Sequence, residues 1–222
     1  MGDRAAKDAL YDGFATMAKA LGNGRRAELI DVLAQGERSV EDLAAELGQS
    51  VANTSQHLRH LAQAGLVIGR RQGSNVIYGL TDPAVGEAWR TLRDLAVDRL
   101  AQMDRLVRTY VGDRDALETI DRAELAARLR SGGVVVLDVR PAAEFRAGHI
   151  PGARPIPVDE LERRLAELPD DGAEVVAYCR GRFCIYADEA VRMLSALGRR
   201  ARRLEDGFPE WAAAGLPVRT GD

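Results

Sequence analysis

The pattern of apolar residues changes near Gly112, and this change restricts the chain to folds with two unlike halves. Before Gly112, apolar residues recur at helical spacing, interrupted by one β-rich stretch. After it, short apolar runs such as residues 134–139 alternate with helical segments. A chain of 222 residues is long enough for two small domains. We therefore expect one domain at residues 1–112 and a second at residues 113–222.

The first half predicts a helix-turn-helix followed by a β-hairpin. Ser39 and Ser50 are each placed to cap a helix, and Gly65 ends the second of these helices. A short helix, a tight turn and a longer helix have the spacing of a helix-turn-helix. Residues 66–80 are rich in β-branched side chains around a glycine-bearing turn, which is typical of a hairpin. The expected fold of this half is a mainly α winged helix-turn-helix with a hairpin wing.

One long helix should follow, from about residue 84 to residue 111, opened by Asp82 and Pro83. Its apolar stripe has no equally long partner helix in this half of the chain. The stripe consists of Leu92, Leu95, Ala96, Leu100, Met103, Leu106 and Val107. We expect part of it to pack against a second copy of the chain, which predicts a homodimer.

The second half predicts an α/β domain with a parallel sheet. Residues 134–139 form an apolar run of the kind found in strands that are buried on both faces. Strand and helix patterns then alternate as far as Trp211. Open sheets of this type bind ligands at the carboxyl ends of their strands.

Both cysteines lie in one hexapeptide, Cys179 to Cys184, between a predicted strand and a predicted helix. Backbone N–H groups and the helix dipole favour an anion at such a turn. Together with Arg180 and Arg182, they predict that the pKa of Cys179 lies below that of a free cysteine. Two cysteines so close in sequence do not make a disulfide scaffold, so we interpret them as reactive thiols.

Charge is distributed unevenly along the chain. The net charge of −3 arises entirely in residues 113–222, since Lys+Arg and Asp+Glu are both 14 in residues 1–112. Between Glu46 and Asp82 there is no acidic residue, and this gap holds three arginines and two histidines. Such a basic island is a candidate nucleic-acid-binding face. No apolar run is long enough to cross a membrane and the N-terminus is unlike a signal peptide, so we expect a cytoplasmic protein without a membrane partner.

Residues 50–61 and 64–67 give the first half its resemblance to the ArsR/SmtB family of winged-helix repressors, over roughly residues 10–110. The resemblance implies a homodimer that binds double-stranded, pseudo-palindromic operator DNA. At helical spacing Val51, Thr54, Leu58 and Leu61 should share the buried face of the recognition helix. The residues expected to contact DNA are Ser50, Asn53, Ser55, Gln56, His57, Arg59 and His60 in this helix, and Arg70 and Arg71 in the wing.

This sequence departs from the metal-sensing members of that family. Residues 40–47 contain no Cys or His, and the predicted helix at residues 84–111 contains no His. The family's usual metal sites therefore lack their ligands, and we expect neither a metal nor another cofactor. Any signal must be sensed elsewhere, and the second half is the best candidate.

The second half resembles the rhodanese (sulfurtransferase) family over roughly residues 116–219. Three segments carry the resemblance: residues 137–153, the loop after Tyr178, and residues 207–218. It implies that Cys179 forms a persulfide, held by backbone N–H groups of the loop that includes Gly181 and Phe183. The six-residue loop is one residue shorter than in the related phosphatases, which favours sulfur over phosphate. Arg180 and Arg182 would attract an anionic sulfur donor, while Asp138, Arg140, Glu144 and His149 would brace the strand ends.

Cys184 stands where plain sulfurtransferases often have Thr, Ser or Arg. A second thiol there either attacks a persulfide on Cys179 to form a bridge or simply fills the start of the helix. Together the two halves predict a repressor that senses sulfane sulfur from thiosulfate, a polysulfide or a low-molecular-weight persulfide. The alternatives are an active sulfurtransferase targeted by DNA binding, an arsenic-responsive regulator with two of the three thiolates arsenite prefers, and a purely structural rhodanese module.

Overall fold

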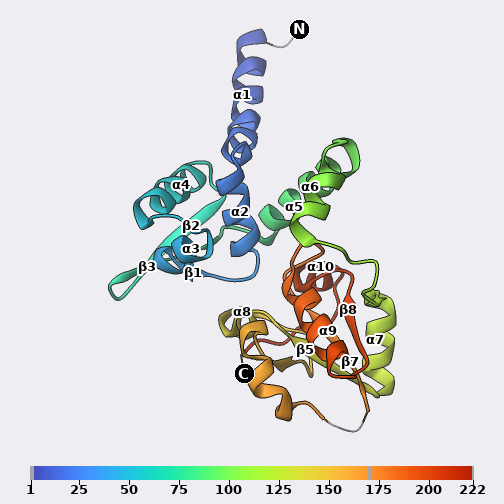
Figure 1. The fold of residues 1–222 in the computed structure, drawn as a ribbon. Helices are drawn as coiled ribbons and strands as arrows, with labels where there is room; N and C mark the ends of the chain where they lie inside the picture. The colour runs from blue at the N-terminus through green and yellow to red at the C-terminus, as the bar shows by residue number, and fades with distance from the viewer. Residues whose placement is uncertain (1–2, 170–171, 222) are drawn as a thin grey trace. The chain divides into compact units, whose positions relative to one another are not determined.

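The computed structural model describes residues 3–169 and 172–221 of the chain (Figure 1). Packing divides the chain into two units, Met1–Ala96 and Val97–Asp222, and each is described by itself. This division falls inside a helix rather than in a linker, so the domain boundary expected after Gly112 stays a prediction.

The first unit contains the expected helix-turn-helix and wing. Ser39 accepts a hydrogen bond from the N–H of Asp42, and Ser50 accepts one from Asn53, so both serines cap helices as predicted. The helices are α1 (Arg4–Leu21), α2 (Gly24–Leu33), α3 (Val40–Glu46) and α4 (Val51–Gln63). The strands are β1 (Arg38–Ser39), β2 (Val67–Gln72) and β3 (Asn75–Leu80), which form an antiparallel sheet in the order β1-β3-β2. The predicted hairpin is confirmed, and β1 adds a short third strand.

Leucines and isoleucines from α2, α3 and α4 form the core of this unit. Leu29, Ile30, Leu43, Leu58 and Leu61 are fully buried. The face of α1 that carries apolar side chains is exposed instead, at Leu10, Tyr11, Phe14 and Met17. In α4 the predicted buried face holds for Thr54, Leu58 and Leu61 but is wrong for Val51, which is 45% exposed. Val51 is the first residue of α4, beyond the turns that pack on the core.

The single long helix expected at residues 84–111 is wrong, because the structure has two helices there. These are α5 (Pro83–Arg99) and α6 (Met103–Val111), separated by three residues that contain neither glycine nor proline. Leu92, Leu95, Leu100 and Leu106 of the predicted stripe are each about half exposed. Helices in proteins are stabilised mainly by packing of an apolar face, and around the break this face is not packed.

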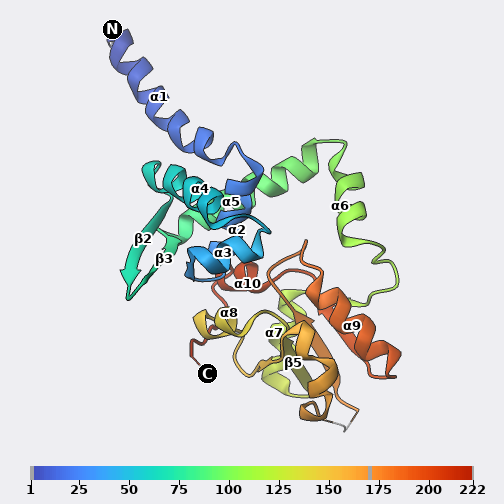
Figure 2. The ribbon, with the colours of Figure 1, turned by 60° about the vertical axis from the view of Figure 1, so that its left-hand side comes forward.

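The second unit is built on a five-stranded parallel sheet, as predicted. The strand order is β4 (Thr119–Ile120), β8 (Ala201–Leu204), β7 (Glu174–Tyr178), β5 (Val134–Asp138) and β6 (Arg154–Pro155). The α-helices are α7 (Arg122–Ser131), α8 (Ala142–Ala147), α9 (Tyr186–Ala196) and α10 (Phe208–Ala213) (Figure 2). Two 3-10 helices, η1 (Val158–Glu160) and η2 (Glu162–Glu167), lie between β6 and β7 in the chain.

Both faces of this sheet are buried, each in its own core. Leu137 and Ala177 pack with Val191 and Leu194 of α9 on one face. Val136 and Val176 pack on the other face, together with side chains of α7 and α10 that include Trp211. Neighbouring residues of one strand thus serve opposite cores, as the alternation of side chains along a strand requires.

A buried ion pair holds together the carboxyl ends of β5 and β7. Arg140 donates to both carboxylate oxygens of Asp138, with its Nη2 at 2.6 Å from Oδ2, and also to the carbonyl of Gly148. The Tyr178 hydroxyl donates to Asp138 Oδ2 at 2.6 Å. The side chains of Arg140 and Asp138 are fully buried, and the guanidinium lies over the ring of Phe208. Removing one partner of such a pair leaves an uncompensated buried charge.

We predict that Asp138→Ala destabilises the second unit by about 3–5 kcal/mol, because it strands the buried charge of Arg140. Tyr178→Phe removes one hydrogen bond and should cost about 1 kcal/mol. Urea denaturation in a Trp89→Phe background, where Trp211 is the fluorescent reporter, measures both free energies of unfolding. Equal effects of the two variants would contradict the role given to the ion pair.

Candidate functional site

The cysteine loop connects the carboxyl end of β7 to the start of α9. Cys179 is 1% exposed, while Cys184 is partly exposed at the end of the loop. The loop is fixed from the side of α10, since the N–H of Phe208 donates to the carbonyl of Cys179. Gly207 approaches the loop so closely that a Cβ atom there would lie 2.1 Å from the nitrogen of Gly181. Only glycine fits at this position.

Both cysteines pack against the core beneath α9, with Cys179 inside it and Cys184 at its edge. The Cys179 thiol donates a long hydrogen bond to the carbonyl of Gly181, at 3.9 Å. Burial raises the pKa of Cys179 well above its usual range, and the neighbouring Cys184 thiol raises it further. The Cys179 thiol lowers the pKa of Cys184, against the effect of burial. The prediction of an acidic Cys179 is therefore wrong, and Cys184 is the more acidic thiol of the two, because Cys179 is buried.

Backbone hydrogen-bonding groups lower the pKa values of both thiols, those of Gly181 and Ala187 at Cys179 and those of Arg180 and Tyr186 at Cys184. The N–H of Cys184 donates to the carbonyl of Gly181, at 3.0 Å. The backbone cradle expected for a persulfide stays a prediction.

The two loop arginines have different surroundings. Arg180 forms a bidentate ion pair with Glu144, with Nη2 at 2.6 Å from Oε1, and its guanidinium lies over the Tyr186 ring. Arg182 is exposed and lies over the ring of Phe183, 5.0 Å from its centroid. The charge of Arg180 is thus matched by Glu144, while Arg182 faces solvent. Of the two, Arg182 is the better placed to meet an anionic donor.

The remaining predicted supporting residues lie close to the same strand ends. Asp138 and Arg140 form the buried pair described above, and Glu144 on α8 reaches the loop through Arg180. His149 is buried and stacks on Phe145, with ring centroids 3.7 Å apart and Nδ1 at 2.9 Å from the Phe145 carbonyl. These contacts place His149 beside α8, on the wall of a 480 Å³ pocket that it shares with Arg146.

Sequence reasoning missed a cluster of charged residues behind the loop. Asp188 in the first turn of α9 is 0% exposed and forms ion pairs with Arg114 and Arg203. Burial, and then the charge of Arg114, lowers the pKa of Arg203. The available signal was Asp188 itself, an acid among Ala187, Ala190, Val191 and Leu194 on the buried face of a helix.

The predicted DNA-binding residues occupy the accessible side of α4 and the wing. Gln56, Arg59 and His60 are exposed. Asn53 and Ser55 are partly buried, with Asn53 bonded to Gln49, and the Ser50 oxygen is engaged as the helix cap. In the wing Arg71 is exposed, whereas Arg70 is paired with Glu37, its Nη2 lying 2.5 Å from Oε2.

His57 lies at the border of the same face. Its Nδ1 is buried and has no hydrogen-bond partner among the described residues. Burial, followed by the charges of Arg26, His60 and Arg25, lowers its pKa. Arg25 and Arg26 of α2 were not predicted to belong to the DNA-binding face. Their place at the start of a helix that precedes the helix-turn-helix is a signal that could have indicated it.

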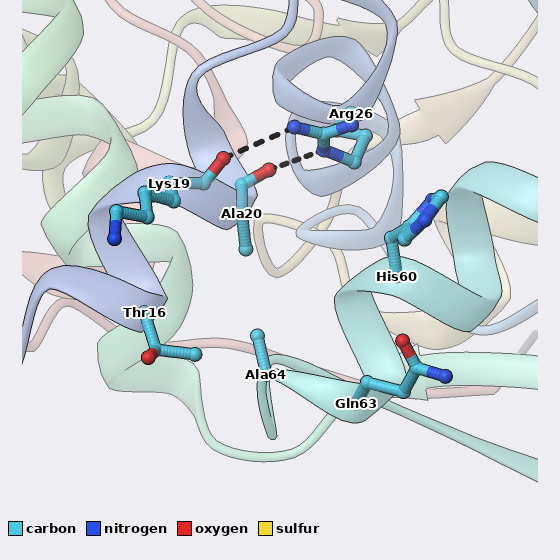
Figure 3. A pocket seen from close by; sticks show the side chains of 7 residues that line it. All are labelled: Thr16, Lys19, Ala20, Arg26, His60, Gln63 and Ala64. Carbon is cyan, nitrogen blue, oxygen red and sulfur yellow. Dashed lines mark hydrogen bonds between the residues drawn. The ribbon is translucent and has the colours of Figure 1, made fainter. Parts of the chain in front are cut away.

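Lys19, Arg26 and His60 line a pocket of 340 Å³ between α1, α2 and α4. Figure 3 shows Arg26 donating to the carbonyl oxygens of Lys19 and Ala20, with His60 and Gln63 projecting from α4 across from it. The pocket extends the basic face of the recognition helix toward α1.

Comparisons with known proteins identify a different family in each half of the chain. The family "Bacterial regulatory protein, arsR family" matches residues 23–68, and "Rhodanese-like domain" matches residues 121–214. The HTH-type transcriptional regulator Rv0324 of Mycobacterium tuberculosis is 43% identical over 215 residues, which cover 97% of this chain and 94% of that protein. The chain belongs to the ArsR family of regulators. It is a member with a carboxyl-terminal rhodanese-like domain, so both predicted resemblances are confirmed.

Other relatives of this ArsR-family regulator match one half only. A sulfurtransferase of Allochromatium vinosum is 36% identical, covering 45% of this chain and 92% of that protein. A homodimeric winged helix-turn-helix DNA-binding domain from Mycobacterium bovis, solved by NMR, is 36% identical with a TM-score of 0.43, covering 46% of this chain and 94% of that one.

Across residues 3–169 and 172–221, no three His, Cys, Asp or Glu side chains are grouped so as to hold a metal ion. Within the same residues, no helix combines the length and apolarity needed to span a bilayer.

We predict that alkylation of Cys184 begins at lower pH than for an ordinary cysteine, whose pKa is about 8.5. Cys179→Ala removes the neighbouring thiol that lowers the pKa of Cys184, so the midpoint of the alkylation rate of Cys184 should move to higher pH. Iodoacetamide labelling followed by intact mass measures both profiles. As a control, Cys179 in Cys184→Ala should label slowly across the same range, because it is buried. If Cys179→Ala leaves the midpoint of Cys184 alkylation unchanged, Cys179 does not lower the pKa of Cys184.

Proposed function

We propose that this DNA-binding regulator is a repressor whose rhodanese-like domain senses sulfane sulfur by persulfidation of Cys179, followed by bridging to Cys184. The single observation that carries the proposal is the pair of free cysteines in the loop after β7, which pack against one core and shift each other's pKa. Two neighbouring thiols can exchange sulfur and then join, which a lone loop cysteine cannot do.

The ionisation of the pair suggests the order of the sulfur chemistry. The Cys184 thiolate attacks the outer sulfur of a persulfide donor; the donor's S–S bond breaks and its thiolate leaves with the electron pair. Cys179 then attacks this transferred sulfur, so that Cys179 carries the persulfide and its proton passes to Cys184. Finally Cys184 attacks Sγ of Cys179, forming the disulfide and releasing the outer sulfur as hydrogen sulfide. The donor is the oxidant throughout.

The exposed apolar surfaces support a dimer of this chain. Leu10, Tyr11, Phe14 and Met17 on α1, and the half-exposed leucines of α5 and α6, are too many large apolar side chains for a free surface. A second copy is the occupant we propose, and a two-fold dimer reads two half-sites of a pseudo-palindromic operator. A tenfold change in operator affinity needs only about 1.4 kcal/mol of coupling between the loop and this dimer.

A second candidate function is catalytic sulfur transfer, favoured by relatives named sulfurtransferases. These include the Allochromatium vinosum protein and a human thiosulfate:glutathione sulfurtransferase that is 35% identical and covers 42% of this chain. The burial of Cys179 and the pairing of Arg180 with Glu144 favour slow, single modification over turnover. A steady-state assay with thiosulfate separates the two functions, since many turnovers per chain would favour the enzyme.

We predict that polysulfide weakens binding of the wild-type protein to its own promoter by about tenfold or more, as coupling of this size is typical. Cys179→Ser should bind the same DNA but lose the response, because neither persulfide nor bridge can end on residue 179. Gel shifts with and without polysulfide measure the affinities, and intact mass measures the modification.

Gln56→Ala is the matched control for the DNA-binding half. It should lose operator affinity in both conditions while its cysteines are still modified, since Gln56 lies on the exposed side of α4. Equal affinity of the wild type with and without polysulfide would refute sulfur sensing. A normal response in Cys184→Ser would reduce Cys184 to a packing residue.

A further inference from the structure

Arg114, two residues beyond Gly112, makes three hydrogen bonds to the cysteine loop and the helix that follows it. Its Nη1 lies 2.5 Å from the carbonyl oxygen of Arg182, and its Nη2 lies 3.0 Å from that of Cys184. Its Nε donates to Oδ2 of Asp188 at 2.6 Å. One guanidinium therefore contacts both carbonyls at the end of the loop and the buried acid at the start of α9.

Asp188 gives this contact a strong electrostatic anchor. The carboxylate is fully buried, so it needs cationic partners to offset the loss of water. Arg203 supplies a second cation, with Nε at 2.9 Å from Oδ1, but its hydrogen is poorly aligned with that oxygen. Arg114 is thus the well-aligned hydrogen-bonding partner of Asp188 among the described residues. The rigid, forked guanidinium suits three acceptors at once, which an ammonium group does not.

The segment that carries Arg114 joins this site directly to α6. That helix ends at Val111, and Gly112 follows with a positive φ of 73°, which glycine adopts readily. Arg192 of α9 donates to the carbonyl of Asp113 at 2.7 Å, and Leu117 packs against the core beneath α9. Residues 113–117 are thus fastened to α9 and the cysteine loop, immediately after α6, whose Leu106 belongs to the proposed dimer surface.

We propose that Arg114 is the positioning residue that holds the reduced cysteine loop and passes its chemical state to α6. This inference rests on the proposed sulfur sensing. Forming a Cys179–Cys184 bond draws together two sulfurs that are not bonded to each other in the reduced loop, and it pulls on the backbone of Cys184. The carbonyl oxygen of Cys184 accepts a hydrogen bond from Nη2 of Arg114. When this carbonyl moves, either that hydrogen bond is lost or residues 113–117 move with the loop.

The alternative explanation is that Arg114 only stabilises the fold. The two explanations differ in one respect: a stabilising residue changes the melting temperature, whereas a coupling residue separates thiol modification from its effect on DNA binding. Arg192 offers a matched control, because its hydrogen bond holds the same linker at the carbonyl of Asp113 and not at the carbonyls of the cysteine loop.

The test compares the full-length wild type with Arg114→Gln, Arg114→Lys and Arg192→Gln. Each protein is treated with polysulfide, its cysteine modification is measured by intact mass, and its promoter affinity is measured by gel shift. We expect Arg114→Gln to be modified as fully as the wild type while its affinity changes less than about twofold, against about tenfold for the wild type. Arg114→Lys should restore part of the response, and Arg192→Gln should keep it.

Two outcomes would overturn the inference. One is a full affinity response in Arg114→Gln, and the other is equal loss of response in Arg192→Gln. If Arg114→Gln does not fold, as judged by circular dichroism, Arg114→Lys decides, and a full wild-type response in it refutes the coupling. If the wild type is modified without any change in affinity, the proposed sensing itself fails. The role of Arg114 in holding the loop is then read separately, from a faster alkylation of Cys184 in Arg114→Gln.

Discussion

The buried charge of Arg140 is the constraint on which the second domain is built. A guanidinium removed from water must be matched, and Asp138 and the carbonyl of Gly148 accept its hydrogens, while the Tyr178 hydroxyl donates to Asp138. This network fixes the carboxyl ends of β5 and β7 relative to each other. Since Cys179 directly follows Tyr178, the network also sets where the reactive loop begins.

Around the thiols the same rule recurs, because each buried charge is matched locally. Glu144 pairs with Arg180, and Asp188 is held between Arg114 and Arg203. Arg114 and Arg203 together still carry one positive charge more than Asp188 offsets, and Arg182 is exposed. Burial nevertheless raises the pKa of Cys179, so the partly exposed Cys184 is the more acidic thiol of the two.

Local signals in the sequence predicted most of the fold. Caps at Ser39 and Ser50, the hairpin turn and the apolar run of β5 depend on neighbouring residues, so they were legible without tertiary information. The errors arose where packing decides. The break between α5 and α6 follows from an unpacked face, and the pKa order of the cysteines follows from burial. The contact of Arg114 with Asp188 joins residues 74 positions apart, a distance over which no local pattern operates.

The close approach of Gly207 to the loop has a consequence for chemical selectivity. By leaving no space beside Gly181, it lets Phe208 bind the carbonyl of Cys179 and seals that thiol from solvent. Oxidation by peroxide follows thiolate character and exposure, and Cys179 has little of either. Hydrogen peroxide in bulk water thus meets a poor target at Cys179, and a reagent reaches the partly exposed Cys184 first. A single missing side chain just before α10 thereby directs oxidants to one thiol of the pair.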